Sequence, residues 1–211
     1  MPTVWVEARR RWRARRAATG AAPPLSRALA RRWRRAAPAG RFLALDLETS
    51  ALDPRSGEIL ALGWVAVDGD RIPLASARRL LVTGAAPVGV SATIHGIRDE
   101  DRARAGLPLR RALLALARAQ RDRTLLFFHA PFDLAFLDAA WRTHFHTPFL
   151  APVRDVRVDA LERLARRGVP LEGGAGSLPA LRARFSLPPH RAHDALDDAV
   201  ATAELFLALR R

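Results

Sequence analysis

Apolar residues recur along the chain in two kinds of run, which predict alternating strands and helices. Near-continuous apolar runs, typical of strands buried on both faces, occupy residues 42–47, 59–67, 71–82, 124–128 and 152–156. Runs with helical apolar spacing or helix-capping signals occupy residues 107–121, 133–144, 157–167, 177–185 and 193–209. The residues between Val82 and Leu107 include the segment 91–97, which matches neither pattern and is expected to be irregular.

The order of these runs predicts the fold class. Asp68-Gly69-Asp70 is a tight-turn signal between the second and third strands, so the chain opens with antiparallel strands. Helices then separate the later strands, as in parallel crossovers. We therefore expect an α/β fold with a mixed five-stranded sheet, antiparallel in strands 1–3 and parallel in strands 4–5, flanked by helices.

Charge divides the chain into two parts. The net charge is +14, all 35 basic residues are arginine, and residues 1–40 hold eleven arginines against one acid, Glu7. We therefore separate an Arg/Trp/Ala-rich N-terminal extension, residues 1–40, from a domain at residues 41–211. Arginine interleaved with tryptophan is suited to phosphates and bases. Two other interpretations stay open: an arm packed on the domain, and an organelle transit peptide.

Composition also excludes several classes of protein. The chain has no cysteine, which rules out a disulfide framework and thiolate metal sites. No apolar run reaches the roughly 18 residues of a membrane span, so we expect no membrane association and a cytoplasmic location. A high pI favours polyanionic partners such as nucleic acid.

Two acids interrupt the first apolar strand. Asp46 and Glu48 are two residues apart, so their side chains point to one face. Two carboxylates on a buried face repel each other and are costly to desolvate. A hard divalent cation, Mg²⁺ or Mn²⁺, resolves that cost. An isolated Asp-x-Glu pair is common, however, so further ligands decide the question.

Further polar residues follow later strands. Asp133 comes just after the fourth strand, at a junction where α/β sheets bind ligands. His193 and Asp198 open the last helix, and Asp194 is its expected N-cap. If these acids converge with the first two, a pair of divalent cations is the natural occupant, suited to phosphoryl displacement. Histidine titrates near neutral pH, so His193 is a candidate general base for an attacking water.

These residues also resemble a known family. Asp46-Leu47-Glu48-Thr49-Ser50-Ala51-Leu52-Asp53-Pro54 resembles the first motif of DEDDh 3′–5′ exonucleases, which include DNA polymerase III epsilon-type proofreading subunits. Ala130-Pro131-Phe132-Asp133 resembles their second motif, and His193-x-Ala195-x-x-Asp198 their third. Ile94-His95-Gly96-Ile97 is similar to the segment that carries a substrate-contacting histidine. The resemblance covers residues 41–208.

The resemblance implies an RNase H-like fold and two-metal hydrolysis of single-stranded 3′ ends, with DNA expected, to nucleoside 5′-monophosphates. It also implies a DNA polymerase as a possible partner. Carried over by position, the first Mg²⁺ or Mn²⁺ is held by Asp46, Glu48 and Asp198, and the second by Asp46 and Asp133. In the same way His193 becomes the general base, and Thr49 and His95 contact the terminal nucleotide.

One position departs from the family pattern. The second motif usually reads His-Asn-Ala-x-Phe-Asp, whereas this chain has Phe128-His129 before Ala130. The change is compatible with catalysis and leaves substrate details open. Two other functions stay open: an RNA-directed DEDDh exoribonuclease, and a catalytically idle nucleic-acid-binding or polymerase-partner module. Histidines 144, 146 and 190 match no motif and are interpreted as structural.

Overall fold

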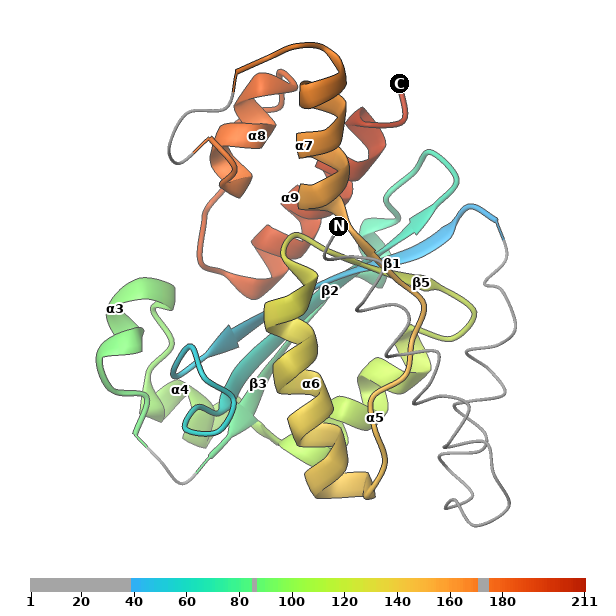
Figure 1. Cartoon of the computed structure of the whole chain (residues 1–211). Coiled ribbons are helices and arrows are strands. Elements are labelled where there is room, and N and C mark those ends of the chain that lie inside the picture. Colours follow the sequence, from blue (N-terminus) through green and yellow to red (C-terminus); the bar gives the residue numbers. More distant parts are fainter. Residues whose placement is uncertain (1–38, 85–86, 171–174) are drawn as a thin grey trace.

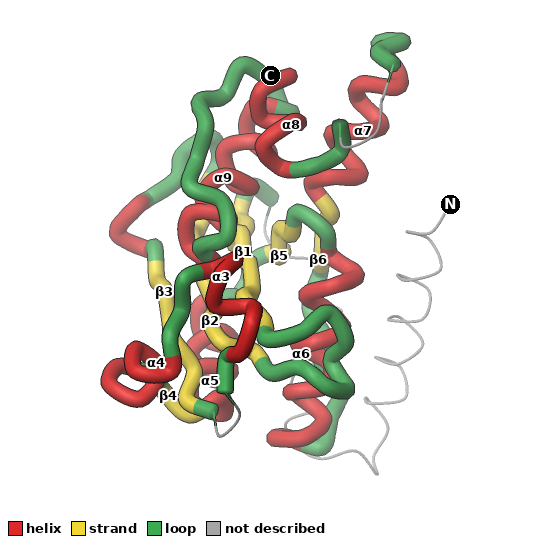
Figure 2. Tube along the Cα trace, turned by 90° about the vertical axis from the view of Figure 1, so that its left-hand side faces the viewer, coloured by secondary structure: helices red, strands yellow, loops and turns green. Residues whose placement is uncertain are grey.

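A six-stranded mixed sheet forms the centre of the protein, in the order β4-β3-β2-β1-β5-β6 (Figure 2). The computed structural model describes residues 39–84, 87–170 and 175–211. The strands are β1 Arg41–Thr49, β2 Ile59–Asp68, β3 Arg78–Thr83, β4 Leu107–Pro108, β5 Thr124–Phe127 and β6 Val153–Asp155. The β1–β2 and β2–β3 pairs are antiparallel, and the other three pairs are parallel. The predicted α/β, RNase H-like class is therefore confirmed.

Helices cover both faces of the sheet. They are α3 Ala92–His95, α4 Asp99–Ala105, α5 Leu109–Ala119, α6 Ala130–Phe145, α7 Val156–Arg166, α8 Leu178–Arg184 and α9 Ala195–Ala208, with 3₁₀ turns at Leu74–Ser76 and Gly89–Ser91. Figure 1 shows α5 and α6 in one group and α7, α8 and α9 in another. Each group shares a separate apolar cluster with the sheet. Within the described ranges, no helix is long and apolar enough to cross a membrane.

Strand β1 contributes to both cores through its alternating side chains. Leu43, Leu45 and Leu47 pack in the core that contains α5 and α6. Ala44 packs in the core that contains α7, α8 and α9. Because side chains alternate along a strand, Asp46 and Glu48 fall on the second face. The core therefore presents the two acids toward α9.

The sheet differs from the prediction in two ways, in the number of strands and in where the third strand begins. It has six strands because Leu107 and Pro108 pair with β3. A proline disfavours helix at the residue before it, and α5 accordingly begins only at Leu109. The third strand was expected from residue 71 but begins at Arg78, since the residues before it form a loop with a 3₁₀ turn. In that loop Ser76 Oγ accepts the N–H of Ala66, 2.9 Å away, in place of a strand neighbour.

Helix α3 lies within the segment 91–97 that was expected to be irregular, and α4 follows it at residues 99–105, where no helix was predicted. Gly96 ends α3 in the left-handed region, at φ 69°. Three acids open α4, residues 99–101, and acids at a helix N-terminus are stabilised by the helix dipole. That acidic run was the available signal for α4, and the sequence interpretation overlooked it.

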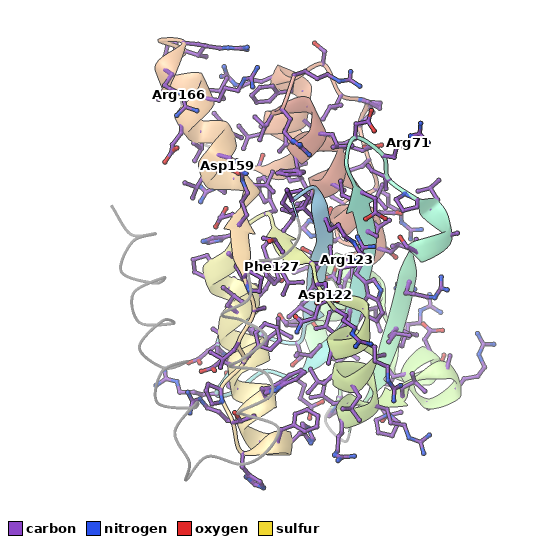
Figure 3. All side chains as sticks on the ribbon, turned by 90° about the vertical axis from the view of Figure 1, so that its right-hand side faces the viewer. Arg71, Asp122, Arg123, Phe127, Asp159 and Arg166 are labelled. Atoms are coloured by element: carbon purple, nitrogen blue, oxygen red, sulfur yellow. The ribbon has the colours of Figure 1, made fainter. Side chains whose placement is uncertain are left out.

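Charged side chains join the ends of the central strands. Arg123, labelled in Figure 3 just before β5, donates to both oxygens of Asp68 at 2.7 and 3.2 Å and to the carbonyl of Phe42 at 3.1 Å. Arginine suits this two-oxygen contact because its donors form a planar fork. The contact ties the start of β5 to the β1–β2 pair. Residues 1–38 of the predicted extension lie outside the described residues.

Candidate active site

The start of α9 crosses the sheet at Gly63. Gly63 pairs with Asp46 of β1 in the antiparallel register. A Cβ at Gly63 would lie 2.1 Å from the carbonyl carbon of Ala195, which is far closer than two non-bonded carbon atoms can approach. Glycine at this position therefore lets the first residue of α9 approach the strand beside Asp46.

Two contacts hold α9 at that place. The Asp194 side chain accepts the backbone N–H groups of Leu196 at 3.0 Å and Asp197 at 3.3 Å, which confirms the predicted cap. Such a cap satisfies N–H groups that have no partner within the helix. Asp194 also forms an ion pair with Arg79 of β3, at 3.2 Å. The beginning of α9 is thus tied to the strand on the far side of Gly63.

Three carboxylates converge where β1 meets α9. Asp46, Glu48 and Asp198 each place an oxygen within 4.8 Å of the other two. Burial raises the pKa of Asp46 well above its usual value, and the charges of Asp133, Asp198 and Glu48 raise it further. Ionising all of them without a counter-charge is therefore unfavourable. A hard divalent cation fits this set of oxygen ligands.

The other two members of this cluster show the same effect. Burial raises the pKa of Glu48 to about 7, and the neighbouring Asp198 and Asp194 add to the shift. Burial also raises the pKa of Asp198, although a hydrogen bond from His190 opposes it. Perturbed carboxylates gathered in one place are typical of functional sites.

Asp133 lies beside the cluster, in the first turn of α6. It is only 5% exposed, and burial raises its pKa to about 8, while its own N–H and that of Leu47 lower it. Its charge is the largest charge effect on Asp46. It is not one of the three carboxylates that lie within 4.8 Å of one another. The structure therefore brings the fourth predicted acid to the edge of the group.

Asp155 at the end of β6 sets the start of α6. Its carboxylate accepts the N–H of Ala130 at 2.9 Å and that of Val158 at 3.2 Å, so one side chain holds the first turns of both α6 and α7. Burial raises the pKa of Asp155 above its usual value, while these two N–H donors and the neighbouring His129 oppose that rise. His129, the residue that departs from the family pattern, is exposed and precedes α6. His129 therefore lies next to Asp155, which holds the start of the helix that carries Asp133.

Two histidines contact Asp198 from the loop before α9. The backbone N–H of His193 donates to Asp198 Oδ2 at 2.9 Å, and the His193 side chain belongs to an exposed residue with φ 64°. His190 Nε2 lies 2.8 Å from Asp198 Oδ1. His190 was interpreted from the sequence as structural because it matches no motif, and this contact with Asp198 was not predicted. Its place in the same short loop as His193, eight residues before Asp198, was the only available signal.

The two predicted nucleotide-contacting residues occupy different settings. Thr49 ends β1 and donates through Oγ1 to the carbonyl of Ala51, at 2.9 Å. His95 is 6% exposed, and its Nδ1 accepts the N–H of Ile97 at 3.1 Å. Burial lowers the pKa of His95, and the nearby His193 and Arg79 lower it further. The neutral form of His95 is therefore favoured, and the residue lies near His193.

A basic cavity of about 310 Å³ adjoins this region. Its lining includes His95, Asp194 and three arginines, Arg79, Arg104 and Arg191. Since Asp194 and His95 belong to the surroundings of the carboxylate cluster, the cavity lies next to it, on the β3 side. Guanidinium groups suit phosphate oxygens.

Comparisons with known proteins agree with this geometry. The model of the RNase T family, described as exonuclease, matches residues 43–206. The chain is 29% identical over 168 residues to the PolC-type DNA polymerase III of Thermotoga maritima, a match that covers 79% of this chain and 12% of that protein. The chain thus spans about an eighth of the length of this curated relative.

Solved structures share the fold. Cell-death related nuclease 4 superposes with a TM-score of 0.68 at 15% identity, covering 82% of this chain and 64% of that one. The zinc-bound complex of E. coli exonuclease I with single-stranded DNA gives a TM-score of 0.70 at 16% identity, covering 81% of this chain and 40% of that one. At such identities the likeness concerns the fold.

Proposed function

Because this chain belongs to the RNase T family of exonucleases, we propose that it is a 3′–5′ exonuclease acting on single-stranded nucleic acid, with DNA as substrate. The observation that carries the proposal is the convergence of Asp46, Glu48 and Asp198 within 4.8 Å, with His193 bonded to one of them through its backbone. Three carboxylates at this spacing have little structural benefit, since burial and then the charges of neighbouring acids raise the pKa values of Asp46 and Glu48.

The carboxylates would hold two divalent cations, Mg²⁺ or Mn²⁺. Asp46, Glu48 and Asp198 form the first ligand set, and Asp46 and Asp133 the second. Buried oxygen ligands with raised pKa values and no thiolate fit these hard ions. Such a pair of cations, when bound, stabilises negative charge on the attacking and leaving oxygens of a phosphoryl displacement.

His193 is the proposed general base. Its side chain is exposed beside the cluster, so a ring nitrogen can accept a proton from a water molecule. That water oxygen bonds to the phosphorus of the terminal nucleotide, the bond from phosphorus to the 3′ oxygen of the preceding nucleotide breaks, and the leaving 3′ oxygen takes up a proton from solvent. The products are a nucleoside 5′-monophosphate and a strand shortened by one nucleotide with a free 3′ hydroxyl.

Thr49 and His95 are the proposed contacts to the terminal nucleotide. Thr49 follows Glu48 directly on β1, and His95 lines the basic cavity beside His193. The arginines of that cavity favour a polyanionic strand. Single-stranded DNA is the partner present in the similar exonuclease I structure, which supports DNA as the substrate here. Similarity to a PolC-type polymerase supports a polymerase as partner. The cytoplasmic location stays a prediction.

End-labelled oligonucleotides test this function. With Mg²⁺ or Mn²⁺, a 5′-labelled single strand should yield a ladder of products shortened from the 3′ end, and a 3′-labelled strand should release only the labelled monophosphate. Faster loss of RNA than of DNA of equal sequence would favour the exoribonuclease alternative, because the 2′ hydroxyl is what distinguishes them. Strand binding without hydrolysis, at any cation concentration, would favour the catalytically idle module.

A further inference from the structure

Both carboxylate oxygens of Asp198 have a hydrogen-bond donor. Oδ2 accepts the backbone N–H of His193 at 2.9 Å, and Oδ1 lies 2.8 Å from His190 Nε2. An ionised carboxylate only accepts hydrogen bonds, so His190 donates to it through Nε2. The two donors come from one loop and fix the plane of the carboxylate, while each oxygen keeps a further lone pair for a cation.

His190 is built to support Asp198 and is shielded from the reaction. Its side chain is only 8% exposed, and Nδ1 is buried without a partner among the described residues. With Nε2 bonded to Asp198 and Nδ1 inaccessible, neither ring nitrogen can take a proton from water. His193, in contrast, is exposed. The two histidines of this loop therefore have different tasks.

A buried arginine fixes the loop that carries His190. Arg182 of α8 is 2% exposed, and its guanidinium donates to the carbonyl of Pro188 at 2.9 Å and to that of Ala201 at 2.8 Å. Glu204 of α9 balances its charge at 2.7 Å. Pro188 lies two residues before His190, and Ala201 lies in the helix that carries Asp198. One side chain therefore sets the distance between the loop and the helix.

We propose that His190 is a positioning residue that orients the Asp198 carboxylate for cation binding, and that Arg182 holds the His190 loop against α9. The inference rests on the proposed function, because it takes Asp198 as a cation ligand. Partners that orient a ligand side chain typically change metal affinity by 10–100-fold when they are removed. His190 should act on cation affinity and leave proton transfer by His193 unaltered.

Two substitutions of the full chain separate positioning from simple packing. In His190→Gln the amide nitrogen reaches about as far as Nε2, so a donor to Asp198 remains. In His190→Asn the amide reaches only about as far as Nδ1, so the donor is lost while a polar side chain is kept. His144→Gln, near the far end of α6, is the matched control. Each protein is titrated with Mn²⁺ alone by calorimetry, and its thermal unfolding is measured without cation.

We expect His190→Asn to bind Mn²⁺ about 10–100-fold more weakly, and His190→Gln and His144→Gln to stay within about threefold of the unaltered chain. Unchanged affinity in His190→Asn would overturn the proposal, as would equal losses in the Gln and Asn variants. If His190→Asn does not fold, His190→Leu takes its place under the same criteria. Arg182→Lys, which keeps the charge for Glu204 but not both carbonyl contacts, should weaken Mn²⁺ binding in the same direction.

The titration also separates this inference from the function on which it rests. It uses Mn²⁺ and no nucleic acid, so it reads the ligand set directly. An unaltered chain that binds Mn²⁺ but leaves every strand intact would contradict the exonuclease function while the His190 comparison still stands. An unaltered chain that binds no Mn²⁺ would overturn the positioning role. With activity present, raising the Mn²⁺ concentration should restore His190→Asn toward the unaltered rate.

Discussion

Gly63 lies directly opposite Asp46 in the β1–β2 ladder, so the position beside a proposed metal ligand carries no side chain. The carbonyl carbon of Ala195 occupies the space where a Cβ would stand, 2.1 Å away. The requirement for glycine is therefore steric, and it links the sheet to the helix that supplies Asp198.

Gly63→Ala should destabilise the fold and separate Asp198 from Asp46. The methyl group meets backbone atoms, which cannot rotate away as a flexible side chain can. We expect a loss of about 1–3 kcal/mol in the free energy of unfolding, the usual cost of overpacking, with weaker Mn²⁺ binding. Gly176→Ala is the control, because there the Cβ would meet only the end of the Arg157 side chain, at 3.1 Å. Equal effects in the two variants, measured by urea unfolding, would contradict the steric explanation.

Asp46→Asn should have opposite effects on activity and stability. The amide keeps the shape but removes a charge shared by both proposed ligand sets, so hydrolysis should fall on the order of a thousandfold. The metal-free protein should become more stable, because burial and neighbouring acids disfavour the charged Asp46. Asp70→Asn, in the exposed β2–β3 turn, is the control. Hydrolysis rates and melting temperatures in chelator check both effects, and a lower melting temperature than the parent would contradict the electrostatic argument.

The metal-free protein should lose stability as the pH rises. The pKa of Glu48 is raised from 4.5 to about 7 and that of Asp133 from 3.8 to about 8. At a pH between the usual pKa of each carboxyl group and its raised pKa, the folded state binds more protons than the unfolded state. The free energy of unfolding therefore decreases with increasing pH. For Glu48 the loss is on the order of 3 kcal/mol between about pH 4.5 and 7. Urea unfolding in chelator from pH 5 to 8 measures it; Glu48→Gln should flatten the curve, and stability that rises with pH would exclude this account.

His193→Asn should separate catalysis from cation binding. Asparagine tolerates the left-handed backbone, so the N–H that donates to Asp198 is kept while the proposed base is removed. We expect kcat to fall by about 10²–10⁴, with Mn²⁺ affinity within about threefold of the unaltered chain. His146→Asn is a matched control, since His146 is also exposed and left-handed, at φ 53°. A large fall in Mn²⁺ affinity would assign His193 to the ligand set instead.

The basic extension should contribute to strand binding through charge. Changing the six arginines of residues 9–16 to glutamine should weaken binding of single-stranded DNA and make it less sensitive to salt, because fewer counterions are released. Hydrolysis of very short strands should continue at the parent rate. Filter-binding assays across a range of salt concentrations provide the measurement. Unchanged affinity and salt slope would favour the alternative in which the extension packs on the domain.

Local patterns predicted the central part of this fold well. The buried strand ending in Asp46 and Glu48 and the cap at Asp194 follow from side-chain alternation and helix capping, which are short-range effects. The prediction for the third strand was wrong about where the strand begins. The N–H of Ala66 donates to Ser76 Oγ there, and not to the backbone of a neighbouring strand. A side-chain contact across ten residues leaves no periodic signal in the sequence.

The site was predictable where a motif exists and not where support comes from distant packing. Asp46, Glu48 and Asp198, which the motifs indicated, place carboxylate oxygens within 4.8 Å of one another in the structure. The contacts of His190 and Arg182 were not predicted, because they depend on how α8, α9 and one loop meet in three dimensions. The requirement for glycine at position 63 was likewise not predicted, because it arises only from the close approach of α9. These three residues carry no catalytic chemistry, so residue type alone did not distinguish them.

Along β1, only Phe42, Leu43 and Ala44 pair with β5, and among the described strands none borders the rest of β1 on that side. The amide of Leu47 donates to Asp133 there. A central strand thus becomes an edge strand beside the carboxylates, and its amide proton is protected from solvent exchange by a proposed metal ligand. The deuterium exchange rate of Leu47 should therefore depend on what Asp133 binds, which makes one backbone amide a spectroscopic reporter of the site.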